Sequence, residues 1–295
     1  MTIGTPGRLY VVATPIGNLG DMSSRAKEIL QTCSLIAAED TRHTGVLLKA
    51  FGIQTPQLSL HDHNERHRAG DLIERLGQGA SVALVSDAGT PAISDPGFEL
   101  VRAAAAAGFE IIAIPGPCAA IAALSIGALP TDRFCFEGFL PARGAARRRR
   151  LQSLAAEART LVLYEAPHRV RETLEDCAAV FGGERSATVA REITKMHETT
   201  YRGSLRDLLA RADVDADFGR GEIVLILAGA PQTLADDDRG ADGHDGALDR
   251  ALKILLGELP LKQAARLAAQ ITEARDNEAY KRALHLKQEC GGRMR

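Results

Sequence analysis

The chain has 295 residues, of which 25% are charged, and its formal net charge is −2 at pH 7. This length is typical of two domains, and the near-zero charge argues against a uniformly basic RNA coat while leaving room for local basic patches. The five cysteines are odd in number and never in C-x-x-C spacing, which disfavours a disulfide framework and a metal site and suits a reducing cytoplasm. No basic segment followed by an apolar one stands at the beginning, so we expect no signal peptide.

Short apolar runs alternate with helical patterns over the first part of the chain. We predict strands at residues 8–14, 35–38, 57–60 and 110–114 and one beginning at Val82, with helices at 23–31, 44–50, 64–76 and 97–107. Strands that alternate with helices at this spacing predict a parallel α/β sheet.

An uncharged stretch at residues 111–131 is long enough to suggest a membrane span. Pro115 and Pro117 interrupt it early, and Gly127 and Pro130 close it. A buried strand, a turn and a buried apolar helix explain it better, so we expect no membrane association.

The strand that begins at Val82 breaks abruptly into a loop that contains Asp87, Gly89 and Pro91. Open α/β sheets bind ligands at loops that leave the carboxyl ends of parallel strands. Gly89 permits close approach of backbone to a ligand, and Thr90 and Ser94 offer hydroxyls. The alternative is an ordinary strand-to-helix turn with a Ser or Asp cap.

The sequence pattern changes at Asp132, where a second α/β domain is predicted to begin. Its strands are expected at residues 134–140, 160–164, 187–193, 198–202 and 222–228, and its helices at 141–158, from 170 to about 180, and at 204–212. The sheet should be mixed because consecutive strands have short connections.

A polar, glycine-rich segment at residues 230–246 reads as a mobile linker, and three amphipathic helical patterns follow at 247–257, 261–272 and 277–288. Apolar residues of this tail should form a small core: Leu248, Leu252, Leu255, Leu256, Leu267, Ile271 and Leu284. The predicted division is therefore 1–128, 129–230, a linker at 231–246 and a helical module at 247–290.

Several common catalytic motifs are absent from the sequence. It contains no G-x-x-x-x-G-K-[ST], no G-x-G-x-x-G after the first strand, no H-E-x-x-H and no G-x-S-x-G. A nucleotide-like ligand would therefore need a binding loop of another kind.

Seven short motifs, taken in their order along the chain, resemble those of a known protein family. They are VATPIGNL at residues 12–19, AEDTR at 38–42, SDAGTP at 86–91, IPGP at 114–117, EGFLP at 137–141, YEAPHR at 164–169 and REITK at 191–195. Together they closely resemble the bacterial 16S ribosomal RNA cytidine 2'-O-methyltransferases of the tetrapyrrole-methylase superfamily. The tail, with LPLKQA at 259–264 and NEAYK at 277–281, resembles that family's helix-turn-helix module.

The resemblance implies two α/β domains of tetrapyrrole-methylase type with S-adenosylmethionine in the cleft between them, plus a small C-terminal helical module. It also implies a homodimer that methylates a ribose 2'-hydroxyl in the small ribosomal subunit. Carried over by motif position, the cofactor-binding residues are Pro15, Asp87, Ala88, Gly89, Thr90, Pro115, Gly116, Cys118, Ala119, Tyr164, Glu165 and Ala190. Related methylases often have Ser or Thr where this chain has Cys118, so a hydroxyl contact is not expected there.

The group that takes the 2'-hydroxyl proton is left open by the sequence. Asp40, Glu165 and Lys195 are the leading candidates, beside His61, His63 and His168. Each has a structural alternative, such as a helix cap at Asp40 or a strand-to-helix brace at Glu165. A dedicated base is also dispensable, because alignment of donor and acceptor supplies much of the rate.

Basic residues near the motifs are candidates for RNA contact. Arg147 to Arg150 wrap most of one helical turn, so not all four can face a core; the alternative is a solvated helix surface. The RNA-binding candidates are Arg42, Arg147, Arg148, Arg149, Arg150 and Arg169, with Arg143 and Lys195 beside them. Two other functions stay open: methylation of a small corrin-type precursor, and a non-enzymatic nucleic-acid-binding regulator.

Overall fold

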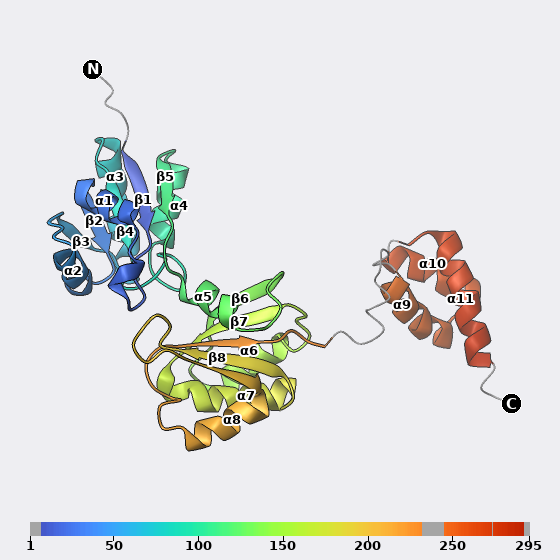
Figure 1. Ribbon diagram of the computed structural model, residues 1–295. Coiled ribbons are helices and arrows are strands. Elements are labelled where there is room, and N and C mark those ends of the chain that lie inside the picture. Colours follow the sequence, from blue (N-terminus) through green and yellow to red (C-terminus); the bar gives the residue numbers. More distant parts are fainter. Residues whose placement is uncertain (1–6, 232–244, 273, 292–295) are drawn as a thin grey trace. The chain divides into compact units, whose positions relative to one another are not determined.

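The computed structural model describes residues 7–231, 245–272 and 274–291 and divides the chain into two compact units, Met1–Ala230 and Pro231–Arg295 (Figure 1). Most of the predicted linker at 231–246 lies outside the described residues.

The first unit begins with a five-stranded, all-parallel sheet in the order β3-β2-β4-β1-β5. Its strands are β1 (Arg8–Val12), β2 (Leu35–Ala38), β3 (Gln57–Ser59), β4 (Val82–Val85) and β5 (Glu110–Ile114). The helices between them are α1 (Ser24–Thr32), α2 (Thr41–Ala50), α3 (Glu65–Gly77) and α4 (Phe98–Ala106). The predicted parallel α/β sheet is confirmed.

Helices cover both faces of this sheet. Leu30 of α1 and Leu48 of α2 pack in one core cluster with Ile36 of β2. Leu72 of α3 and Leu100 of α4 pack in the other. Because both faces are buried, the inner strands β2 and β4 are continuously apolar, as expected for a parallel sheet.

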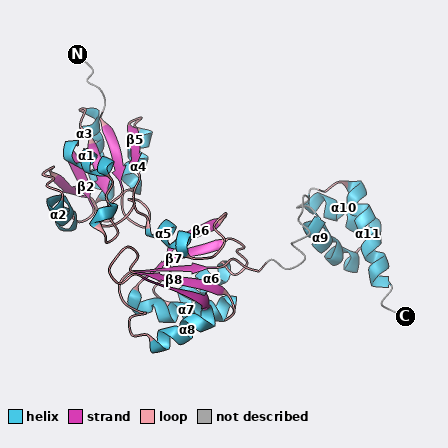
Figure 2. Ribbon diagram, viewed as in Figure 1, coloured by secondary structure: helices cyan, strands magenta, loops and turns pink. Residues whose placement is uncertain are grey.

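The second sheet of the unit is mixed, in the order β6-β7-β10-β8-β9 (Figure 2). β6 (Phe134–Phe139) and β7 (Thr160–Glu165) pair in parallel, whereas β8 (Ser186–Arg191), β9 (Thr199–Ser204) and β10 (Ile223–Leu227) make antiparallel pairs. Helices α6 (Gly144–Ser153), α7 (Val170–Phe181) and α8 (Leu205–Val214) bury one face, and α5 (Ala119–Ile126) buries the other.

Helix α6 is shorter than the predicted 141–158. Arg143 is its N-cap, and after Ser153 the backbone N–H groups of Leu154 and Ala155 turn back to carbonyls three residues earlier. This tighter turn ends the helix at Ser153, before the end of the charged segment that was predicted to be helical.

The second unit is a three-helix module of α9 (Asp245–Glu258), α10 (Leu261–Thr272) and α11 (Asp276–Gly291). Leu248 and Leu252 are fully buried, and Leu255 and Leu256 pack against them, as predicted. The prediction was wrong for Leu267, Ile271 and Leu284, which are 40%, 66% and 41% exposed. Helices α10 and α11 complete the core mainly with small residues instead, namely Ala265, Ala268, Ala269, Ala279 and Ala283, beside Leu286.

Across the described ranges, every helix is too short or too polar to cross a bilayer.

Candidate functional site

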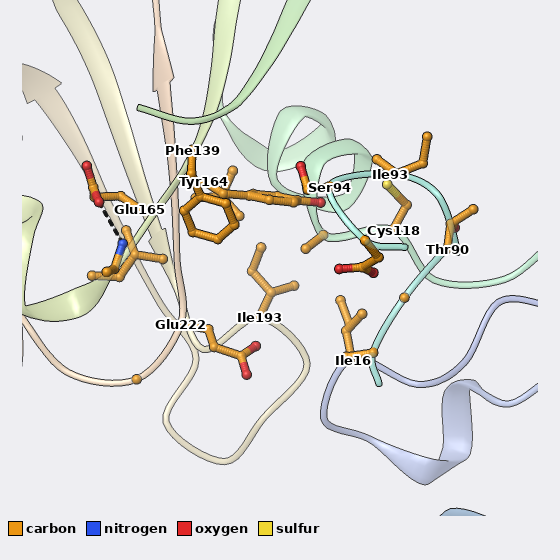
Figure 3. Close-up of a pocket in the computed structure, with 18 of the residues that line it drawn as sticks. Ile16, Thr90, Ile93, Ser94, Cys118, Phe139, Tyr164, Glu165, Ile193 and Glu222 are labelled. Atoms are coloured by element: carbon orange, nitrogen blue, oxygen red, sulfur yellow. Dashed lines mark hydrogen bonds between the residues drawn. The ribbon is translucent and has the colours of Figure 1, made fainter. Parts of the chain in front are cut away.

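A cavity of about 300 Å³ opens in the first unit (Figure 3). Segments after β1, β4 and β5 form part of its wall, with Ile16, residues 88–90 and 93–95, and Cys118. The ends of β6, β7 and β8 and the start of β10 supply the rest, with Phe139, residues 164–167, Ile193 and residues 221–224. The cavity thus lies at the carboxyl end of the parallel sheet, where open α/β sheets bind ligands.

The loop after β4 is tied to the segment after β1. Thr14 and Gly89 exchange two backbone hydrogen bonds, with N···O distances of 2.8 and 3.1 Å. Gly89 has a φ of +83°, and a Cβ built on it would lie 3.3 Å from Cγ2 of Ile16. The residue is therefore glycine for its backbone conformation and for the close approach of the cavity wall.

The same loop is strained further along and held by a buried carboxylate. Ala92 and Ser94 both have a φ of +66°, which is unfavourable for residues with a Cβ. Oε1 of Glu65, from α3, accepts backbone N–H groups of Gly97, Glu99 and Leu100 at 3.0, 2.7 and 3.2 Å. Glu65 thereby caps α4 from a neighbouring helix and fixes the end of the loop.

The start of α5 is completed by the second sheet. Cys118 is the N-cap of α5 but makes no side-chain cap bond, as expected for a cysteine. The Tyr164 hydroxyl accepts the Ala120 N–H instead, at 3.3 Å. Burial raises the pKa of Tyr164, and Phe136 and Phe139 contact its ring at centroid distances of 5.0 and 5.6 Å. Figure 3 shows Tyr164 and Phe139 side by side on the cavity wall.

The candidate bases differ in the hydrogen bonds and ion pairs that their side chains already form. Glu165 lines the cavity, but its carboxylate is 1% exposed and accepts the Ala166 N–H at 2.7 Å and the Thr173 hydroxyl at 2.5 Å. Lys195 forms ion pairs with Glu192 at 2.8 Å and Glu222 at 3.2 Å. Both arrangements are those of structural braces.

Asp40 caps α2 by accepting the Arg42 N–H at 2.8 Å and does not line the cavity. The side-chain hydrogen bond from Arg42 holds the pKa of Asp40 well below its usual range, which makes its carboxylate a poor proton acceptor. His61, His63 and His168 also lie outside the cavity wall.

Seven of the predicted cofactor-binding residues line the cavity, namely Ala88, Gly89, Thr90, Cys118, Ala119, Tyr164 and Glu165. The other five are not among its lining residues: Pro15, Asp87, Pro115, Gly116 and Ala190. Ala190 is fully buried and pairs with Val224 across β8 and β10. Gly116 leaves room for Ala13, whose Cβ lies 2.9 Å from where a Cβ of residue 116 would stand.

The sequence did not point to one side of the cavity. Residues 221–224 belong to no motif, yet β10 pairs antiparallel with β7, and this places Ile223 opposite Glu165 and Val224 opposite Tyr164. Asp95, Phe139 and Ile193 were also missed. For Asp95 there was a signal, because it follows Ser94 in a second Asp-Pro-Gly break of the same loop.

The arginine turn divides into one buried and three exposed residues. Arg147 is 3% exposed, and its Nε donates to Oδ2 of Asp176 at 2.7 Å, so a phosphate contact by this residue was a wrong prediction. Arg148 and Arg150 are about half exposed and pair with Asp176 and Glu137, whereas Arg149 is exposed. Arg42 is 91% exposed in its side chain, and Arg169 donates to the Leu140 carbonyl at 2.8 Å.

Within the described residues, no three His, Cys, Asp or Glu side chains are grouped so that they could hold a metal ion.

Comparison with known proteins agrees with the fold. Residues 8–209 match the family model of Tetrapyrrole (Corrin/Porphyrin) Methylases, and residues 242–287 match that of the RsmI C-terminal HTH domain. Among solved structures, the methyltransferase CobJ superposes with a TM-score of 0.57 at 20% identity, covering 77% of this chain and 97% of that one. Uroporphyrin-III-C-methyltransferase from Thermus thermophilus has a TM-score of 0.54 at 20% identity, with 75% and 94% covered. These two likenesses establish the fold alone.

Curated relatives are much more similar. The chain is 53% identical over 278 residues to Ribosomal RNA small subunit methyltransferase I of Pseudomonas aeruginosa, covering 94% of this chain and 97% of that one. It is 51% identical to the protein of the same name from Escherichia coli O157:H7, with 94% and 95% covered. The resemblance seen in the motifs is thus confirmed, together with two α/β sheets and a C-terminal helical module: the chain belongs to the tetrapyrrole methylase family and, within it, to the ribosomal RNA small subunit methyltransferase I group.

Proposed function

We propose that this protein transfers the methyl group of S-adenosylmethionine to the ribose 2'-hydroxyl of a cytidine in 16S ribosomal RNA. The observation that carries the substrate class is identity above 50%, over nearly the whole chain, to proteins named as small-subunit ribosomal RNA methyltransferases. The ribose position and the cytidine rest on the resemblance of the seven motifs.

The cavity fits the cofactor. Its volume of about 300 Å³ is at the lower end for small-molecule sites. Ile16, Ile193 and Val224 offer apolar wall to the adenine and the methylthio group, and the backbone around Gly89 offers amide and carbonyl groups to the polar ones. When bound, S-adenosylmethionine supplies a methyl group already activated by a positive sulfur.

The protein's own contribution would be alignment. A displacement at a methyl carbon needs the acceptor oxygen held in line behind that carbon, and fixed geometry of this kind supplies much of a rate enhancement. The Thr14–Gly89 bridge and the Glu65 cap hold one wall of the cavity. The bond between Tyr164 and Ala120 joins this wall to the second sheet.

The homodimer, the boundary near residue 128 and RNA contact by the helical module are part of the same proposal. Helix α5 supports a contact between copies, because it is almost wholly apolar and leaves Ile121 52% exposed. The exposed Arg42, Arg148, Arg149 and Arg150, with Arg169 beside the cavity wall, are the proposed phosphate contacts.

A second candidate is methylation of a small tetrapyrrole precursor, because the solved structures with this fold include uroporphyrin-III-C-methyltransferase and cobalt precorrin-4 methyltransferase. Their identity to this chain is only 15–20%, so they carry less weight for the substrate than the ribosomal RNA relatives do.

The test is transfer of labelled methyl to small ribosomal subunits lacking the modification, to naked 16S RNA and to uroporphyrinogen III, each with a chelator present. We expect label in RNA, and a 2'-O-methylcytidine after digestion to nucleosides. Label in the tetrapyrrole alone, or in a base instead of a ribose, would refute the proposal. We also expect S-adenosylmethionine to bind without a metal ion, and loss of cofactor binding in the presence of chelator would refute this expectation.

A further inference from the structure

Within the described residues, Asp95 is the carboxylate of the cavity wall that is neither buried in a brace nor part of an ion pair, although its side chain hydrogen-bonds to that of Ser86. It lies on the loop between β4 and α4, six residues after Gly89, and lines the cavity. The carboxylate of Glu165 is buried and bonded to Thr173 and Ala166, and that of Glu222 is 72% exposed and paired with Lys195. Asp95, in contrast, takes part in none of the ion pairs found within the described ranges.

Asp95 is partly buried, and other carboxylates surround it. Burial, followed by the negative charge of Glu39 after β2, raises the pKa of Asp95 to about 6. The charges of Asp87 on its own loop and of Asp62 before α3 raise this pKa further, whereas a hydrogen bond with the Ser86 side chain lowers it. Tyr164, from the second sheet, lines the same cavity, and the charge of Asp95 contributes to the raised pKa of that phenol after burial and Cys118. Asp95 is therefore ionised at neutral pH but a stronger base than an ordinary aspartate.

The backbone around Asp95 is held in one conformation. Ser94 before it has a φ of +66°, and Gly97 after it has a φ of +128°, with no room for a Cβ because Leu84 Cδ2 would lie 2.7 Å away. Glu65 then fixes the Gly97 N–H at 3.0 Å. Strained backbone held by its surroundings is a feature of functional sites, where it positions a reacting group.

We propose that Asp95 accepts the proton of the ribose 2'-hydroxyl during methyl transfer. The inference rests on the proposed function. As the oxygen–carbon bond forms, the carbon–sulfur bond breaks, its electron pair goes to the sulfur, and the sulfonium becomes a neutral thioether. The hydroxyl proton passes to a carboxylate oxygen of Asp95 and from there to solvent.

The test compares the parent with Asp95→Asn and Asp95→Glu in single-turnover methyl transfer to small ribosomal subunits, at saturating S-adenosylmethionine and over pH 5 to 9. General-base help typically contributes about 10²–10⁴-fold. We expect the parent rate to fall below a pH of about 6, where Asp95 becomes protonated. Asp95→Asn should be slower by about 100-fold or more, without this pH break. Asp95→Glu should recover part of the rate. Cofactor affinity by calorimetry should stay within about threefold in all three proteins, as a Kd change of that size is below 1 kcal/mol.

Two results would overturn the inference alone: an Asp95→Asn variant that keeps the parent's rate or pH break, or one that loses cofactor affinity but keeps its rate at saturation. The second would make Asp95 a cofactor-binding residue. A parent enzyme that binds S-adenosylmethionine but methylates no RNA would refute the proposed function, and the inference with it. Circular dichroism of each variant excludes unfolding as the cause.

Discussion

Replacing Gly89 by alanine tests whether the loop after β4 is built for a ligand. With a φ of +83°, Gly89 has a backbone conformation that disfavours any L-residue with a Cβ by about 1–2 kcal/mol. The new Cβ would also lie 3.3 Å from Ile16 Cγ2, which is tight. If the loop relaxes to relieve this strain, the cofactor must restore the binding conformation. We therefore expect its Kd to rise about 5- to 30-fold, and Gly89→Val, which adds two further methyl groups, to abolish binding.

Gly108 provides the matched control. It has a φ of +77° and is exposed after α4, and a Cβ there would meet nothing within 4 Å. Gly108→Ala should lose a similar 1–2 kcal/mol of stability, on the order expected for a left-handed residue, and leave cofactor affinity unchanged. The assays are calorimetric titration with S-adenosylmethionine and urea unfolding of both variants. Equal affinity in the two variants would refute the reasoning and reduce Gly89 to an ordinary turn glycine.

Four further predictions concern the arginines of α6, the helical module and the Glu65 cap. Replacing Arg148, Arg149 and Arg150 together by alanine should weaken RNA binding and flatten its salt dependence by up to about one unit of slope per lost phosphate contact; an unchanged slope in filter binding would assign these residues to a solvated surface. Arg147→Ala should instead lower stability, because it leaves Asp176 without its buried partner. Truncation after Ala230, where the first unit ends, should preserve cofactor affinity and dimer formation and raise the RNA concentration for half-maximal methylation; a monomeric product would make the helical module an assembly element. Glu65→Ala should cost about 1–3 kcal/mol in urea unfolding through its orphaned N–H groups and weaken cofactor binding, whereas Glu65→Gln, which keeps an acceptor oxygen, should lose less; equal losses would argue against the cap.

The elements of the fold were predictable where local chemistry decides them. The Ser23 and Ser204 caps begin α1 and α8, and short apolar runs mark the strands. Burial was less predictable. The helical period assigns Leu267 and Ile271 to a core. Close packing of α10 against its neighbours favours alanine, however, and only the assembled helices show which side faces inward. Arg147 is part of a run of four identical residues, and its burial depends on Asp176 of a different helix.

The candidate site was predictable on the side that motifs form. Gly89, Cys118 and Tyr164 were identified and line the cavity. Ile223 and Val224 were missed because their place depends on the antiparallel pairing of β10 with β7, about 60 residues earlier in the chain, and strand order is not encoded in a local pattern.

The position of β10 also affects the order in which the chain can fold during synthesis. The parallel sheet has all its strands once residue 114 is made, but the second sheet has its central strand last, since β10 joins β7 to β8. Until residues 223–227 leave the ribosome, the pairs β6–β7 and β8–β9 have no strand between them, and each presents an unpaired edge. The N-terminal half of the unit should therefore become protease-resistant on nascent chains well before the second half, which should acquire its structure in a single late step.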